Sequence, residues 1–106
     1  MAGIKRDSDK IRYDLMPMYP LEEVAKVFTH GAEKYDDRNW EQGMDWNRPY
    51  GALLRHVFAF WSGEDIDPES QLHHLAHAIC EAMFLLEYTK TKKELDNRPD
   101  EKSKDS

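Results

Sequence analysis

Apolar residues recur with helical spacing along three stretches of the chain. In residues 21–35 they stand three or four positions apart, which predicts a first helix with Pro20 in its opening turn. A second helix is predicted over residues 49–62, where a proline opens the stretch and Gly63 follows its end. A third and longer helix is predicted over residues 70–94. No stretch shows the alternation of a strand.

The remaining segments have their own compositions. Residues 1–20 are polar and then interrupted by prolines, which predicts an extended arm. Residues 36–48 contain Asp, Asn, Gly and two Trp, which indicates an ordered loop. Residues 93–106 are charged and almost free of apolar side chains, so we expect a disordered tail. The expected fold is all-α: residues 1–92 form one small bundle of three main helices plus short helical turns.

The third helix, for which Ser70 is the expected N-cap, has two unlike faces. At 100° per residue its predicted core stripe is Leu72, Leu75, Ala76, Ile79, Met83 and Leu86. The predicted core stripe of the second helix is Tyr50, Leu54, Val57, Phe58 and Trp61. The opposite face of the third helix begins with histidines but continues as Phe84, which solvent would not favour. We therefore expect a second cover from another copy of the chain, so that oligomerisation completes the bundle.

Composition limits the kinds of partner. The 106 residues favour a single domain, and a net charge of -6 argues against a nucleic-acid polymer as the main ligand. No apolar run approaches the ~18 residues that a membrane span needs. The N-terminus lacks the apolar run of a signal peptide, and the single cysteine, Cys80, excludes an internal disulfide and suits a reducing compartment. We expect a cytoplasmic protein, in the host cytoplasm if a phage encodes it.

Metal-capable side chains are concentrated after the second helix. Glu64 and Asp67 stand three residues apart, and His74 and His77 repeat that spacing on one face of the third helix, where a metal can bridge two imidazoles. Glu33 on the first helix is a further candidate. These residues are expected to be metal ligands or to support the ligands directly. The alternative is that the acids are ordinary surface residues of a turn and that the two histidines are a polar pair at the start of a helix. Oxygen ligands favour Mg²⁺ or Mn²⁺.

Other polar residues suit catalysis or substrate binding. His56 lies off the apolar stripe of the second helix. It is expected to be a metal ligand, a proton acceptor for the attacking water or a structural histidine. Glu64 is the candidate catalytic carboxylate. The cationic side chains of Lys34, Arg38 and Arg55 could bind phosphates. The alternative for each is an ordinary charged residue on the surface. Asn39 and Trp40 could contact the base or sugar of a substrate. The alternative is that they anchor their loop.

Taken together, these segments resemble a known family. The strings DKIRYDLMP, LEEVAKVFTHGAEKYDDRNW, GALLRHVFAFWSGEDIDPES and HLAHAICEAMFLLEY are similar to the phage-borne dATP/dGTP diphosphohydrolases of MazZ type. Those proteins are related to the MazG-like, all-α NTP pyrophosphohydrolases. The resemblance covers about residues 9–89, and the combination GAxKY, RNW, RH, GEDxD and HLAHA is specific where one piece alone would be weak.

The resemblance implies a helical enzyme that forms a dimer or tetramer. Its members cleave a purine (deoxy)nucleoside triphosphate between the α- and β-phosphorus atoms, giving the monophosphate and pyrophosphate, with Mg²⁺ or Mn²⁺. MazG-like enzymes bind metal through an ExxE and an ExxD motif on two helices. Here His74 and His77 stand at the acidic positions of the second motif, and neither of the first two helices carries an ExxE.

Two other functions are compatible with the residues. An HD-type phosphohydrolase also uses His and Asp on helices, although this chain lacks the adjacent His-Asp pair of that class. A small acidic helical protein could instead be a non-enzymatic interaction module that mimics nucleic acid. Such a mimic needs spread negative charge and gains nothing from clustered histidines.

Overall fold

The computed structural model describes residues 9–99, and helices and short helical turns joined by loops make up that range. Its α-helices are α1 (Met18–Lys34), α2 (Asn47–Trp61) and α3 (His74–Thr91). Its short 3-10 turns are η2 (Tyr13–Leu15), η3 (Asn39–Gln42) and η4 (Lys93–Leu95). Within residues 9–99 the only β-type pairing is an isolated bridge between Ile66 and His73. The all-α prediction of three main helices and short turns is confirmed.

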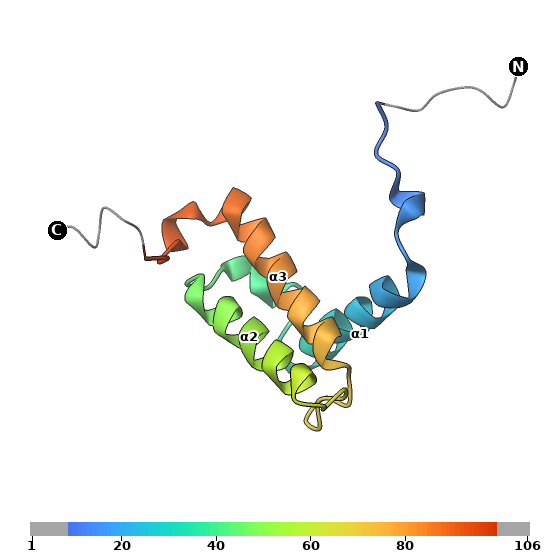
Figure 1. Cartoon of the computed structure of the whole chain (residues 1–106). Coiled ribbons are helices and arrows are strands. Elements are labelled where there is room, and N and C mark those ends of the chain that lie inside the picture. The colour runs from blue at the N-terminus through green and yellow to red at the C-terminus, as the bar shows by residue number, and fades with distance from the viewer. Residues whose placement is uncertain (1–8, 100–106) are drawn as a thin grey trace, which may run out of the picture.

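The central element is α3, which packs against both other helices. Figure 1 shows α2 antiparallel beside α3, with α1 crossing on the other side of α3 and residues 9–17 projecting away from the bundle. Residues 9–17 are the described part of the predicted arm, which ends before residue 20 because α1 begins at Met18. None of the described helices is long and apolar enough to cross a membrane.

The hydrophobic core lies between α1 and α3. Val24 and Val27 of α1 contact Ala76 and Cys80 of α3. The exposed fraction of each of these residues is only 4–6%. The partly buried side chains that pack on this cluster are Phe28, Leu72 and Phe84. Small residues on α3 thus allow α1 to approach closely, while the aromatic rings close one end of the contact.

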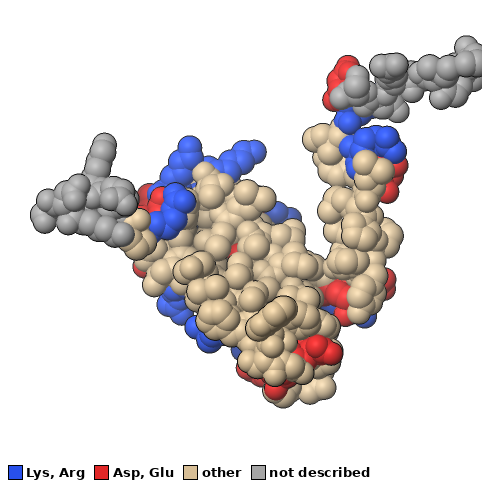
Figure 2. All heavy atoms as spheres, in the orientation of Figure 1, with Lys and Arg blue, Asp and Glu red and all other residues tan. Residues whose placement is uncertain are grey.

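The predicted core stripes of α2 and α3 were mostly wrong, because seven of their eleven residues are exposed. The members that are buried or partly buried are Leu54, Val57, Leu72 and Ala76. The exposed members of the α3 stripe are Leu75, Ile79, Met83 and Leu86. The exposed members of the α2 stripe are Tyr50, Phe58 and Trp61. Apolar residues surround α3 on all sides, so their spacing alone could not show which side meets the bundle. Figure 2 shows the face over α2 and α3 with little charge across its middle.

The ends of the helices follow local chemistry, with one correction. Gly63 adopts φ 106° just after α2, as its position predicted. The N-cap of α3 is His73 rather than Ser70, because the His73 ring accepts a hydrogen bond from the backbone N–H of Leu75. The hydroxyl of Ser70 is engaged elsewhere, with Asp67 and His77.

Part of the predicted tail docks on the start of α2. The indole Nε1 of Trp46 donates to the carbonyl of Lys92 at 3.1 Å, and its backbone N–H donates to that of Leu95 at 3.2 Å. The amide of Asn97 donates to the side-chain oxygen of Asn47 at 2.7 Å. Residues 93–99 therefore belong to the described fold, while residues 1–8 of the arm and 100–106 of the tail lie outside the described residues.

Candidate functional site

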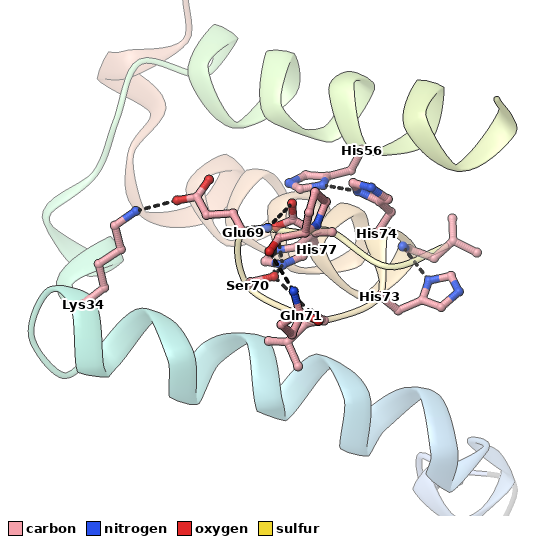
Figure 3. A network of polar contacts seen from close by, with 12 residues as sticks. Lys34, His56, Glu69, Ser70, Gln71, His73, His74 and His77 are labelled. Atoms are coloured by element: carbon pink, nitrogen blue, oxygen red, sulfur yellow. Dashed lines mark hydrogen bonds and ion pairs between the residues drawn. The ribbon is translucent and has the colours of Figure 1, made fainter. Parts of the chain in front are cut away.

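A cavity of about 1140 Å³ opens between α1, α2, α3 and the loop that leads into η3. Its volume suits a ligand at least as large as a nucleotide. At one end stand His56, His74 and His77, and at the other the rings of Phe28, Trp40 and Phe84. Figure 3 shows the histidine end, where His56 reaches from α2 toward the two histidines of α3.

Glu64, His74 and His56 form a chain of hydrogen bonds. His74 is 5% exposed, and its Nε2–H donates to Glu64 Oε1 at 2.7 Å. Since a carboxylate can only accept, Nε2 carries the proton of a neutral His74, and its Nδ1 accepts from His56 Nδ1–H at 2.9 Å. A neutral His56 then has an unprotonated Nε2. Because His56 lines the cavity, that nitrogen has the chemistry to accept a proton or to bind a metal there.

Asp67, Ser70 and His77 form a second chain of the same kind. The Ser70 hydroxyl donates to Asp67 Oδ2 at 2.9 Å, so it accepts from His77 Nε2–H at 2.6 Å. His77 is left with an unprotonated Nδ1. Its ring stacks on that of His56, with centroids 4.5 Å apart and an interplanar angle of 7°. The imidazoles of His56 and His77 thus lie face to face at one end of the cavity. Each is linked to a carboxylate through one intermediate residue, His56 through His74 and His77 through Ser70.

The electrostatics keep these imidazoles neutral. Burial lowers the pKa of His56, and the neighbouring His77 and His74 lower it further. Burial also lowers the pKa of His77. Burial alone would raise the pKa of Asp67, but hydrogen bonds from Ser70 and from backbone N–H groups hold it below its usual value. Near pH 7 the site therefore pairs neutral bases with an ionised acid.

Cationic side chains surround the cavity. Lys34 of α1 reaches across to Glu69 with an Nζ–Oε1 distance of 3.5 Å. Arg38 pairs with Glu41 and lies 5.8 Å from the centroid of the Trp40 ring. The remaining arginines of the lining are Arg48 and Arg55. Such a spread of donors suits a ligand with several anionic groups.

Trp40 is part of the aromatic wall. Its ring stacks on Phe84 with centroids 5.7 Å apart and meets Phe28 edge-on at 6.4 Å. Its carbonyl accepts a 2.6 Å hydrogen bond from the hydroxyl of Tyr88, which has no exposed surface. These contacts fix the η3 turn against α3, so the wall is rigid.

The structure gathers most of the predicted site residues in one place. The predicted residues that line the cavity are Lys34, Arg38, Asn39, Trp40, Arg55, His56, Asp67, His74 and His77. Glu64 supports His74 instead of lining the cavity. Glu33 does not line the cavity. It lies in an adjoining depression with His30, Lys34 and Glu69, which line the cavity as well.

The donor chemistry of the histidine end fits a divalent metal. Metal-binding histidines usually donate their second ring N–H to a carboxylate or another acceptor, as both hydrogen-bonded chains provide. No three His, Cys, Asp or Glu side chains in residues 9–99 already stand in the arrangement of a metal site. His77 and Asp67 both line the cavity, so the unprotonated Nδ1 of His77 and the carboxylate of Asp67 are donors that a metal there could use.

Glu81 is a site residue that the sequence analysis did not select. It lies on the cavity wall one turn after His77, so its position on the histidine face of α3 could have identified it. Burial raises its pKa to about 7, against the opposing effect of Arg55. A carboxyl group with this pKa is protonated in part at neutral pH.

Replacing Glu81 by glutamine should remove a pH-dependent loss of stability. Below its ordinary pKa of 4.5, Glu81 is protonated in both the folded and the unfolded chain. As the pH rises from 4.5 to about 7, only the unfolded chain ionises, so the folded state loses stability. After allowance for solvent screening this loss is on the order of 1–2 kcal/mol. Urea unfolding at pH 4.5, 6 and 8 measures it; the exposed E87Q variant is the control. Equal pH dependence in E81Q and wild type would contradict this assignment.

Comparison with known proteins agrees with the resemblance in the sequence. Residues 1–98 match the family described as dATP/dGTP diphosphohydrolase, N-terminal. This chain belongs to that family. A relative named dATP/dGTP diphosphohydrolase, from Salmonella phage PMBT28, is 41% identical over 85 residues. No solved structure matches the chain.

The match has unequal coverage. It includes 80% of this chain but 29% of the phage relative, so the chain spans less than a third of that relative's length. Family membership favours neither the HD-type enzyme nor the interaction module, and the sequence contains no adjacent His-Asp pair.

Proposed function

We propose that the chain hydrolyses purine deoxynucleoside triphosphates, dATP and dGTP, between the α- and β-phosphorus atoms. The products are the monophosphate and pyrophosphate. The observation that carries this proposal is the pair of carboxylate-anchored, neutral imidazoles at the end of a cavity lined by four Lys and Arg side chains. The family match and the name of the phage relative support the substrate class.

In this mechanism His56 accepts the proton of the attacking water. Glu64 holds His74 in the tautomer that receives the His56 Nδ1–H, which leaves His56 Nε2 free for the proton. Lowering of the His56 pKa by burial keeps the ring unprotonated at neutral pH. Glu64 therefore acts through His74, as a positioning residue.

Mg²⁺ or Mn²⁺ belongs to this proposal as a cofactor. Asp67 and His77 would hold it from the cavity side, with Ser70 orienting both. When bound, the ion would neutralise phosphate charge and lower the pKa of a bound water. Lys34, Arg38 and Arg55 would hold the phosphate oxygens, which stabilises the charge that develops on the leaving pyrophosphate.

Incubation of the purified protein with each (deoxy)NTP and Mg²⁺ or Mn²⁺ tests this function. Ion-exchange chromatography should show monophosphate and pyrophosphate from dATP and dGTP. EDTA should abolish the reaction, and added Mn²⁺ should restore it. Release of nucleoside and triphosphate would instead support the HD-type mechanism, and a folded protein without turnover would support the interaction module.

We also propose that two or more copies associate through the outward faces of α2 and α3. Those faces expose Phe58 and Trp61 at 64% and 86%, and Ile79 and Leu86 at 42% and 73%. Contiguous apolar area of this kind on a small chain favours burial against another copy. Figure 2 shows that charge lies mainly at the edge of this face.

Replacing Ile79 by glutamate should weaken self-association about 100-fold or more. In a symmetric dimer each copy buries the new charge, so its cost counts twice. Light scattering after size exclusion should show the wild type as a dimer or tetramer and I79E as a monomer. Leu21→Glu on α1 is the matched control, because Leu21 has the same 42% exposure as Ile79. A monomeric wild type would refute the interface.

A further inference from the structure

Glu81 is an acid on the cavity wall that has no hydrogen-bond or ion-pair partner among the described residues. Its side chain forms no hydrogen bond or ion pair within residues 9–99, although it is only partly exposed and lines the cavity. Arg55 of α2 acts on it through charge alone. Its carboxyl oxygens stay open to the cavity, because no side-chain nitrogen or oxygen of the described residues is both fully buried and without a hydrogen bond. The position therefore suits an interaction with a ligand instead of with the protein.

The place of Glu81 in the cavity indicates which part of a nucleotide it meets. Along α3, at about 1.5 Å per residue, Glu81 lies roughly 6 Å beyond His77 and roughly 4 Å before Phe84. It therefore stands between the hydrolytic end of the cavity and the wall formed by Phe84 and Trp40. A flat purine against those rings would present its edge near the Glu81 carboxyl group.

We propose that Glu81 recognises the Watson–Crick edge of the purine, accepting from guanine when ionised and pairing with adenine when protonated. This inference rests on the proposed function, because it takes the ligand to be a purine nucleotide. The carboxylate accepts from guanine N1–H and from its amino group. The protonated carboxyl donates to adenine N1 and accepts from its amino group. One side chain then serves both dGTP and dATP.

The surroundings of Glu81 allow both forms near neutral pH. Burial raises its pKa to about 7, whereas Cys80 and Tyr88 have pKa values raised to about 12 and stay neutral. The other titratable or charged groups of the cavity wall are His30 and Lys34 of α1, Asp36, Asp37, Arg38 and Arg48 of the connecting loop and the start of α2, Arg55 and His56 of α2, Asp67 and Glu69 before α3, and His74 and His77 of α3. A ratio of two nucleotide affinities cancels the effect of these groups on the shared triphosphate.

Equilibrium binding of non-hydrolysable α,β-methylene dGTP and dATP tests the inference. Calorimetry with Mg²⁺ at several values from pH 5.5 to 8.5 gives the affinity ratio for wild type, E81Q and the exposed control E87Q. In wild type and E87Q the preference for dGTP should rise about tenfold or more with pH. E81Q should bind dGTP about 10- to 100-fold more weakly, the scale of a lost charge-assisted hydrogen bond, and its ratio should not change with pH.

A wild-type ratio that does not vary with pH, or an E81Q ratio equal to that of wild type, would overturn the inference. Turnover of dGTP and dATP is measured in parallel to separate the two proposals. Turnover with a constant affinity ratio rejects the role of Glu81 alone. A pH-dependent ratio without turnover rejects hydrolysis alone, and an absence of binding to either analogue rejects both.

Discussion

The His56→Ala variant should hydrolyse dGTP and dATP with a kcat at least about 100-fold below that of wild type. It removes the nitrogen that would accept the proton of the attacking water. It also leaves His74 Nδ1, which is 2.9 Å from the His56 ring, without its donor. The remaining cations of the cavity still bind triphosphate, so the expected loss falls mainly on kcat rather than on KM.

His73→Ala is the matched control for His56→Ala. His73 precedes His74 in the sequence. Its ring caps α3 and does not line the cavity, so its removal tests the loss of a histidine outside the site. H73A should lose about 1 kcal/mol of stability and keep its turnover. Steady-state kinetics on both variants, with circular dichroism to confirm folding, makes the comparison. A folded H56A protein with unchanged kcat would remove His56 from the mechanism.

Replacing Tyr88 by alanine should lower the free energy of unfolding by about 3–5 kcal/mol. Tyr88 has no exposed surface, and its hydroxyl holds the carbonyl of Trp40 at 2.6 Å. The truncation leaves a cavity under η3 and releases the aromatic wall. Tyr88→Phe removes only the hydroxyl and should cost about 0.5–1.5 kcal/mol. Urea unfolding at pH 7 measures both values.

Tyr19→Ala provides the exposed counterpart, since Tyr19 of α1 is 67% exposed. It should change stability by no more than about 0.5 kcal/mol. If Y88A and Y19A were equally stable, Tyr88 would not anchor η3 as the structure shows. Loss of dGTP binding in Y88F at temperatures where it remains folded would further link this anchor to the site.

The helices were predictable because their ends have local causes. Gly63 ends α2 through its positive φ, and proline lies in the first turns of α1 and α2. The orientation of α2 and α3 was not predictable, because side chains such as Phe58 and Ile79 are as apolar as any core residue. Only the packing of α3 against α1 and of α2 against α3 decides which side of each helix is inside.

The sequence predicted which residues belong to the candidate site better than it predicted the hydrogen bonds between them. His74 and His77 were selected from their spacing, and the structure places both beside His56. Their partners depend on where the turn before α3 directs Glu64 and Ser70, which requires the tertiary fold. Glu81 was missed although it shares the histidine face of α3, because a glutamate on a helix is usually solvated. The tertiary fold shows that this one is partly buried and lines the cavity.

Hydrolysis of dGTP in ¹⁸O-labelled water tests the central proposal most directly. Mass spectrometry of the products shows which phosphorus the water attacked. Attack on the α-phosphorus, with His56 taking the proton, predicts that the label appears in dGMP and that pyrophosphate is unlabelled. Label in pyrophosphate, or formation of products other than dGMP and pyrophosphate, would contradict it.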